Sequence, residues 1–507
     1  MLSILLAITV AAAPEWTLLA FPRSTRALDS APIESVLLDG SHLDLAAGFR
    51  PAALELPEPP IPGAIFQQML DETLRQRGMK LETRPQAGLL LARGDAAALE
   101  VARALIADID RQTAAFEIDL EITLKRTGAG LRETQWRRRV QAGTEAFFGS
   151  RSSRPFISGF NVQVAQDAGQ TEPQIGAAYS GVGLHLRATR LAGGTRVFVD
   201  GVFDSAEIAA VESFDPGTPD VGVFDQPRVE SVQVAFSGAM ASGAGIEVQL
   251  AGAGLALGDT VLSIRATARP DAAPANDGWV LVDLAFSSLA PRPLMPVDPG
   301  LALDMSTYES DTGSALLTPA VLATLIESDR AGADGRSGRT QLLWSRSLLA
   351  IPRSDAPRIE AARALVRAAE ESRSATQVAT LACGPLRAAF PVSMGRLARL
   401  VVGSERPYLT DYGLEVAPQV WMPSPLVERA FEGISAEIML SGDSLGLQAW
   451  RATTPEVLVA PLLAAQMGGL QLPTRRRVAG SGRTASGEPP LAVFDEGPVL
   501  TLATSTP

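Results

Sequence analysis

The sequence is poor in the residues that most often carry chemistry or cross-links. Its 507 residues include one cysteine, Cys383, and two histidines, His42 and His185. A single cysteine excludes an intramolecular disulfide framework and a zinc site built on cysteines. A nucleophilic cysteine needs a base such as histidine, and a lone cysteine is more often a small buried side chain. We therefore expect Cys383 to lie in the core.

Basic residues are also fewer than acidic ones. Lysine and arginine number 44 against 56 acidic residues, which gives a net charge of −12. Such a chain has no general electrostatic attraction to DNA or RNA, so no nucleic-acid partner is expected. Arginines cluster at 137–139 and 475–477, and we expect both clusters to be solvated strand or loop positions.

The motifs of common enzymes are missing as well. The sequence has no P-loop, no G-x-S-x-G, no H-E-x-x-H and no Rossmann glycine fingerprint. Glu117, Asp119 and Glu121 share one face of a predicted strand, and carboxylates are ligands for Ca²⁺ or Mg²⁺. Alternate strand residues are about 7 Å apart, however, whereas a hard cation needs convergent oxygens. We expect no enzyme activity, no catalytic, cofactor-binding or metal-binding residues, and no cofactor.

Long apolar runs are limited to the start of the chain. Leu2–Ala13 resembles the hydrophobic region of a signal peptide, with small residues for cleavage near Ala11 or Ala12. It lacks a preceding lysine or arginine, and the alternative is a buried N-terminal strand. No later segment has 18 continuous apolar residues. The pattern predicts an exported protein.

The clearest structural pattern runs from Gly88 to Lys125. Leu89–Ala92 predicts a buried strand, and Asp95 is placed to cap a helix by accepting bonds from its first free N–H groups. Five apolar–polar alternations in Phe116–Lys125 predict a strand with one buried face. The apolar face of the helix comprises Leu99, Ala102, Leu105, Ile106 and Ile109.

A second helix is predicted upstream, over Ile65–Leu74, with Gly78 as its stop and a strand at Met79–Thr83. The whole unit then reads α-β-β-α-β. Residues 127–290 alternate in short segments separated by Gly, Ser, Asp and Pro, which is typical of antiparallel β structure. His185 falls on the polar face of one segment. The predicted strands are Phe160–Gln166, Val182–Ala188, Arg196–Phe203, Val232–Phe236, Ile246–Leu250, Val261–Ala266 and Val280–Phe286.

The second half of the sequence repeats parts of the first. Asp355–Val366 matches Asp95–Ile106 at seven of twelve positions, 260 residues later. Arg406–Ile438 matches Arg154–Leu186 at seven of 33 positions, 252 residues later. Two matches in the same order predict an internal duplication with a period of about 250 residues, too long for a solenoid.

Leu89–Leu124 resembles the last periplasmic ring-building module of secretins, the outer-membrane channel proteins of type II and type III secretion and of pilus machines. The resemblance rests on a strand, a Gly-Asp step, a helix ending at Ile106–Asp110, and a charged alternating strand. Gly181–Phe203 is similar to a secretin hairpin, and Gly258–Leu262 to the family's G-x-T stretch. The Gly-Gly step and V-P-x-L-G segment of the family are missing, so the resemblance implies the fold and not a working channel.

Together these patterns predict an α+β fold with two copies of an α-β-β-α-β ring-module-like unit, each followed by a β-rich antiparallel domain. The resemblance implies a non-catalytic envelope protein of the periplasm or outer membrane, which associates with itself, with other secretion-complex proteins or with the outer membrane. The alternative is a soluble periplasmic scaffold or binding protein whose two copies form an intramolecular pseudo-dimer. The predicted divisions are a signal peptide at 1–13, an extension and proline-rich linker at 14–63, a first module at 64–126, a first β-rich domain at 127–290, a linker at 291–312, a second module at 313–375 and a second, degenerate β-rich domain at 376–507.

Overall fold

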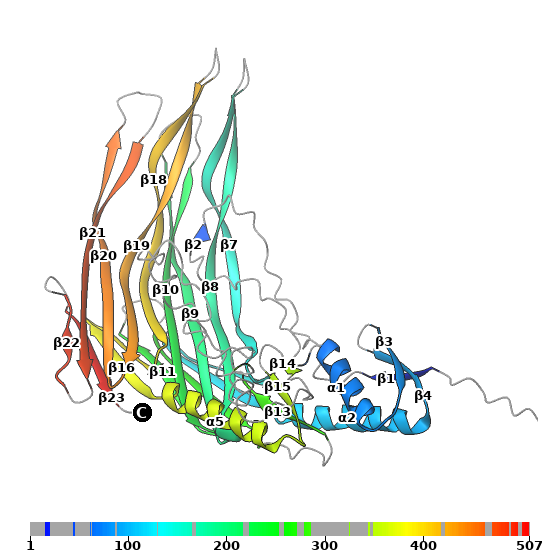
Figure 1. Cartoon of the computed structure of the whole chain (residues 1–507). Coiled ribbons are helices and arrows are strands. Elements are labelled where there is room, and N and C mark those ends of the chain that lie inside the picture. Colours follow the sequence, from blue (N-terminus) through cyan, green and yellow to red (C-terminus); the bar gives the residue numbers. More distant parts are fainter. Residues whose placement is uncertain are drawn as a thin grey trace, which may run out of the picture.

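The structure is a computed structural model, and most of its described residues are in antiparallel strands (Figure 1). The predicted signal peptide, His42 and the linker at 291–312 lie outside the described residues. The described residues are 16–20, 44–45, 61, 63–86, 89–128, 130–164, 169–215, 223–252, 258–270, 278–284, 324, 343–344, 348–416, 421–461, 469–485, 488–494 and 499–505.

Two small α+β modules, each with an antiparallel sheet, stand at different points of the chain. The first has a three-stranded sheet in the order β1-β4-β3, and the second a three-stranded sheet in the order β13-β15-β14. The elements of the first are β1 (Thr17–Ala20), α1 (Gly63–Gln76), β3 (Leu81–Gln86), β4 (Leu89–Gly94) and α2 (Ala96–Ala114). Those of the second are β13 (Trp279–Asp283), β14 (Leu343–Trp344), β15 (Leu348–Pro352) and α5 (Ala356–Arg373).

Long strands form a nine-stranded sheet in the order β2-β8-β9-β10-β18-β19-β20-β21, with β7 also paired to β8. In Figure 1 these strands rise away from the end of the molecule that carries α5 and the first module. The short β2 (Asp44–Leu45) is parallel to β8. The other bounds are β7 (Glu145–Val164), β8 (Gly169–Leu191), β9 (Arg196–Phe214), β10 (Phe224–Ala241), β18 (Leu397–Val416), β19 (Trp421–Ser441), β20 (Ser444–Pro461) and β21 (Gly469–Ala485).

Shorter strands form an eight-stranded sheet in the order β22-β23-β16-β17-β11-β12-β5-β6. Its pairs are all antiparallel. The bounds are β5 (Glu117–Gly128), β6 (Gly130–Gln141), β11 (Gly245–Ala251), β12 (Asp259–Ala268), β16 (Thr376–Cys383), β17 (Leu386–Ser393), β22 (Leu491–Ala492) and β23 (Leu500–Ser505). A 3-10 turn, η3 (Ala192–Gly194), joins β8 to β9.

One large apolar cluster joins both sheets and the first module. Leu184 and Leu186 of β8 belong to the same buried cluster as Ile122 and Leu124 of β5. Leu105 of α2 is part of it as well. The period-2 alternation of the strands places every second side chain on this inner face. The sheets are therefore held together mainly by apolar burial.

Helix α2 begins as the sequence predicts, and it ends at Ala114, beyond the predicted end at Ile106–Asp110. Asp95 adopts extended backbone angles at the N-cap, and its carboxylate accepts a 2.6 Å hydrogen bond from the Ala98 N–H. A lost N-cap of this kind costs about 1 kcal/mol. Helix α1 also agrees with its prediction and buries Phe66, Met69 and Leu70. Among the described residues, no helix has the length and apolar character to cross a membrane.

Two predicted strands have unexpected partners. The sequence predicts Phe116–Lys125 as the last strand of the first module, but β5 pairs with β6 and β12 in the eight-stranded sheet. It predicts Val280–Phe286 within the first β-rich domain, yet β13 pairs with β15 in the second module. Alternation identifies the buried face of a strand and leaves its neighbours open, which is why both assignments differ from the structure.

Candidate functional site: the junction between the two halves

The carboxylates Glu117, Asp119 and Glu121 do not converge. Each faces arginines of a neighbouring strand. Asp119 binds Arg139 at 2.7 Å, and Glu121 lies 3.2 Å from Arg137. These contacts use the oxygens that a cation would need. Within the described part of the chain, no group of three or more His, Cys, Asp or Glu side chains could hold a metal ion.

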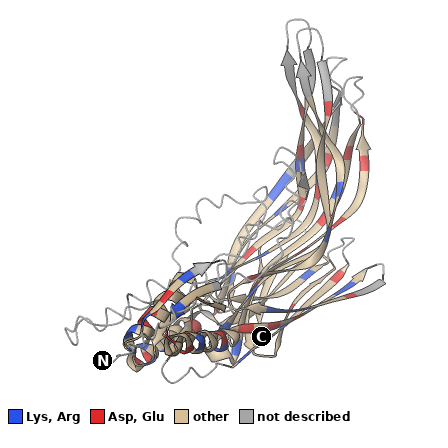
Figure 2. Cartoon of the chain, turned by 90° about the vertical axis from the view of Figure 1, so that its right-hand side faces the viewer, with Lys and Arg blue, Asp and Glu red and all other residues tan. Residues whose placement is uncertain are grey.

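Both arginine clusters lie on exposed strands, as predicted. Arg137, Arg138 and Arg139 are exposed on β6, and Arg476 and Arg477 are exposed on β21. Figure 2 shows acidic and basic positions interspersed along the strands of both sheets. Exposed pairs of this type contribute about 0–1 kcal/mol each, so they align strands more than they stabilise them.

Cys383 lies in the core, as predicted. It ends β16 and belongs to the large apolar cluster. Burial raises the pKa of its thiol, because the thiolate would lose solvation there. A buried thiol with a raised pKa is a poor nucleophile.

A buried polar cluster lies on the face of β8 and β9 that points away from the large apolar cluster. Arg151 donates to both carboxylate oxygens of Asp204, at 2.7 and 2.8 Å. A side chain at Gly183 would collide with this guanidinium, since an added Cβ would lie 2.0 Å from Arg151 Nη2. Burial raises the pKa of Asp204 to about 7, and the charge of Arg151 opposes that rise.

His185 joins the same cluster. It lies on the polar face of β8, as predicted, but it is buried, and its ring centroid is 4.9 Å from that of Phe147. Burial lowers its pKa to about 4, and the neighbouring charge of Arg151 adds to the effect. Its Nε2 has no hydrogen-bond partner among the described residues. His185 is therefore neutral at pH 7, and no sequence motif marks this cluster.

The strand order of the first half, residues 16–270, recurs in the second half, residues 278–505. In the nine-stranded sheet, β7-β8-β9-β10 is followed by β18-β19-β20-β21. In the eight-stranded sheet, β11-β12-β5-β6 corresponds to β22-β23-β16-β17. The halves meet through different strands of each, because β10 pairs with β18 and β17 pairs with β11. The contact is thus head-to-tail and not two-fold.

Local irregularities recur at matching places. The β7·β8 register shifts between Ile157 and Gly159, and the β18·β19 register shifts between Leu409 and Asp411. Ile157 and Leu409 are counterparts in the gapless match of Arg154–Leu186 with Arg406–Ile438. The Ile157 N–H binds Asp225 at 3.3 Å, while the Leu409 N–H binds Gln471 at 3.3 Å. The long hairpins therefore contact β10 and β21 in the same manner.

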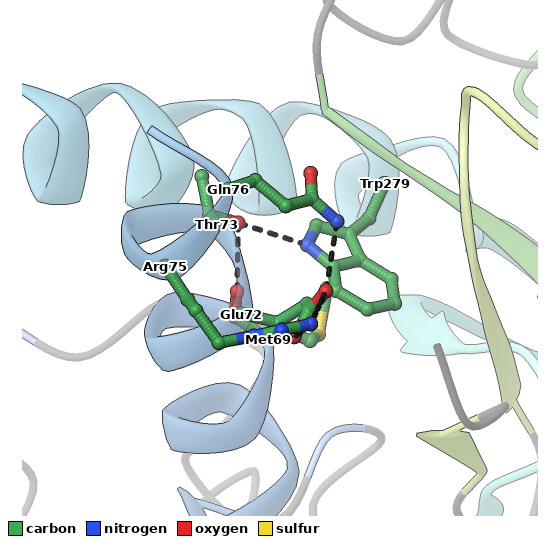
Figure 3. A network of polar contacts seen from close by, with 6 residues as sticks. All are labelled: Met69, Glu72, Thr73, Arg75, Gln76 and Trp279. Carbon is green, nitrogen blue, oxygen red and sulfur yellow. Dashed lines mark hydrogen bonds and ion pairs between the residues drawn. The ribbon is translucent and has the colours of Figure 1, made fainter. Parts of the chain in front are cut away.

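The modules also meet head-to-tail. Trp279 of β13 donates its indole N–H to Thr73 Oγ1 of α1 at 3.1 Å, and that hydroxyl donates to the Met69 carbonyl (Figure 3). Gln112 of α2 binds the backbone of β13: its Nε2 donates to the Trp279 carbonyl at 2.8 Å, and its Oε1 accepts from the Leu281 N–H at 3.1 Å.

This contact is buried and specific. Trp279 is 3% exposed and Gln112 is 4% exposed. A buried amide with both ends bonded satisfies the backbone groups of an edge strand. Sequence analysis missed the contact, since an isolated Gln and Trp 167 residues apart carry no pattern.

Comparison with known proteins gives weak structural matches only. No family model matches the sequence, and no curated protein matches it. A near-atomic structure of the Salmonella SPI-1 type III secretion injectisome secretin InvG is 11% identical, with 41% of this chain and 80% of that chain covered at a TM-score of 0.20. The InvG secretin-domain β-barrel is 11% identical, with 52% and 90% covered at a TM-score of 0.23.

A third match is the injectisome basal body of InvG, PrgH and PrgK, again 11% identical, with 41% of this chain and 57% of that chain covered and a TM-score of 0.20. All three values lie far below 0.5.

Proposed function

We propose that this chain is a non-catalytic, secretin-like envelope protein built from two tandem copies of one unit, and that it serves in a secretion- or pilus-type assembly. The head-to-tail junction carries the proposal. A heterologous contact uses two different surfaces, so one of each stays uncovered at the ends of the pair. Such a unit is suited to adding further copies.

The order of elements supports the tandem copies. The elements β1, β3–β12 and α2 of the first half correspond to β13–β23 and α5 of the second. Both sequence matches between the halves fall inside these counterparts. The pairing of β13 with β15 favours a second copy that begins near residue 279, before the linker at 291–312.

Location and partners belong to the same proposal. The leader at 1–13 favours export to the periplasm or outer membrane. The partners would be further copies of this chain or other envelope secretion-complex proteins. The resemblance of Leu89–Leu124 to a secretin module supports this choice over a catalytic role.

The alternative is a monomeric periplasmic scaffold. The burial of Trp279 between the modules favours it, since one chain already supplies both sides of that contact. Its two copies would form an intramolecular pseudo-dimer and need no further chain.

Light scattering of the full chain separates the two proposals. We expect a mass of several chains in plain buffer or in mild detergent. A mass of one chain in both, across a range of protein concentrations, would contradict the assembly and favour the scaffold.

A further inference from the structure

Strands β1 and β13 occupy corresponding places in the two modules. Leu19 of β1 pairs with Leu90, and Val282 of β13 pairs with Leu349. All four side chains lie in the buried cores of their modules. The same register places Leu18 at the position of Leu281, and Trp16, just before β1, at the position of Trp279.

These corresponding side chains differ in burial. Trp279 and Leu281 are 3% and 8% exposed, because they lie against α1 and α2 of the first module. Trp16 and Leu18 are 38% and 58% exposed. The first module therefore leaves Leu18 exposed, and Trp16 partly exposed beneath Arg84 and Arg93, where the second module buries the corresponding pair.

The corresponding helix face of the second module is exposed at the other end of the chain. Helix α5 corresponds to α2, and Asp355 and Asp95 are their equivalent N-caps. Counted from these caps, Ala368 and Ser372 stand where α2 has Asp108 and Gln112. Both are exposed on α5. This face of α5 is therefore accessible to a β1 strand of another chain, with Ser372 in place of the Gln112 amide.

We propose that the Trp16–Leu18 face of β1 docks on α5 of a second copy of this chain, as β13 docks on α2 within one chain. This inference rests on the proposed function and names its partner and contact surface. Burial of the exposed apolar pair supplies the driving force. One chain then adds to the next by the geometry that already joins its two halves.

The same step joins the outer edges of the nine-stranded sheet. Strands β7 and β21 lie at its opposite ends (Figure 1). Their counterparts β18 and β10 are paired within the chain. Strand β21 of one copy would therefore pair antiparallel with β7 of the next.

We call this proposed pairing of β21 with β7 the seam. The internal junction of β10 with β18 sets its register. Gly181, Ala206 and Ser231 lie side by side on β8, β9 and β10, as Gly433, Ala452 and Arg477 do on β19, β20 and β21. Ser231 of β10 therefore corresponds to Arg477 of β21.

The positions on β7 and β18, the partner strands of the seam and of the internal junction, correspond in the same way. Arg151 of β7 pairs with Gly181, and Gly403 of β18 pairs with Gly433. Because the two glycines are counterparts, Arg151 corresponds to Gly403.

The neighbouring pair defines the proposed contact. Glu230 and Ser404 are paired across the internal junction, and they correspond to Arg476 and Ser152. Both of these side chains are exposed. The seam therefore places Arg476 of one copy directly opposite Ser152 of the next.

Leu18→Asp tests the docking of β1. We expect self-association, followed by light scattering against concentration, to weaken at least tenfold, with the thermal midpoint unchanged because Leu18 is exposed. Leu426→Asp is the matched control, since Leu426 is 50% exposed on β19, away from the seam. Assembly of the Leu18 variant at wild-type strength would overturn the inference.

Paired cysteines test the register. Oxidation of Ser152→Cys/Arg476→Cys should give a ladder of disulfide-linked chains, because directly opposed strand residues suit disulfide geometry. Ser153→Cys/Arg476→Cys should give none, since its side chains point to opposite faces. If the chain assembles but the first pair forms no ladder, the seam is wrong and the proposed function stands. If every form is monomeric, both fail.

Discussion

At the residue scale, the buried pair of Arg151 and Asp204 depends on a neighbouring residue that has no side chain. Gly183 leaves the space in which the guanidinium reaches the carboxylate. The ring of Phe147 lies 4.8 Å from the Arg151 guanidinium carbon and covers it. Removing one member of a buried ion pair typically costs about 3–5 kcal/mol, because the other charge is left uncompensated. The cluster therefore fixes β7, β8 and β9 relative to one another.

His185 and Asp204 change the free energy of unfolding in opposite directions as the pH rises. Between about pH 4 and 6.5 folded His185 lacks a proton that the unfolded chain binds, so it makes the free energy of unfolding rise with pH. Folded Asp204 keeps a proton between about pH 4 and 7 that the unfolded chain has lost, so its contribution falls with pH. The two slopes oppose each other.

His185→Gln removes one of these slopes. Relative to wild type, we expect the variant to gain about 2 kcal/mol between pH 7 and pH 5, because it no longer has to keep a buried imidazole neutral. Urea unfolding at both pH values measures the difference. An equal effect of the substitution at pH 7 and pH 5 would contradict the lowered pKa of His185.

At the element scale, helices are easier to predict than strand partners. The α2 helix has its cap and its apolar stripe in one continuous stretch, so local signals suffice for its start and its buried face, whereas it ends at Ala114, beyond the predicted end at Asp110. Strand β5 alternates clearly, yet one of its two neighbours, β12, lies far along the chain, beyond β6 to β11. Pairing is decided by long-range packing, and alternation does not record it.

The candidate site, too, could be predicted only in part from the sequence. The two sequence matches indicate two related halves, but they give no direction of contact. The Gln112–β13 contact depends on one amide reaching two backbone groups. Only the three-dimensional arrangement brings those residues together.

Gly181 tests the close approach of β8 to β7. Its φ is +122°, and an added Cβ would lie 2.1 Å from the Ser150 carbonyl oxygen. We expect Gly181→Ala to cost about 1–3 kcal/mol in urea unfolding, because the backbone must shift or remain strained. Gly446→Ala on β20 is the control, since its nearest neighbour would lie at an ordinary 3.7 Å. Equal stability of the two variants would contradict this role for Gly181.

The proposed seam contains one unfavourable pair. Its register places Arg477 of one copy opposite Arg151 of the next, where the internal junction has Ser231 and Gly403. Like charges directly opposite on paired strands are destabilising. Within its own chain Arg477 lies over the Trp450 ring, 4.6 Å from its centroid.

Arg477→Ser should therefore tighten self-association severalfold at low salt. The gain should shrink at high salt, where the repulsion is screened. Sedimentation at two ionic strengths measures both effects. Weaker association of the variant at low salt would show that the register is different.

At the scale of the whole molecule, the two halves meet head-to-tail in three places. The modules, the nine-stranded sheet and the eight-stranded sheet all join the first half to the second through non-equivalent surfaces. Heterologous contacts close into rings or continue as helical filaments, according to their rotation. In the proposed assembly, every chain would contribute two similar units.

Electron microscopy of the assembled chain, combined with its mass by light scattering, tests this account most directly. The mass gives the number of chains, and averaged images give the number of repeating units. We predict two repeating units for every chain. One unit per chain, or particles that remain single chains in buffer and in mild detergent, would contradict it.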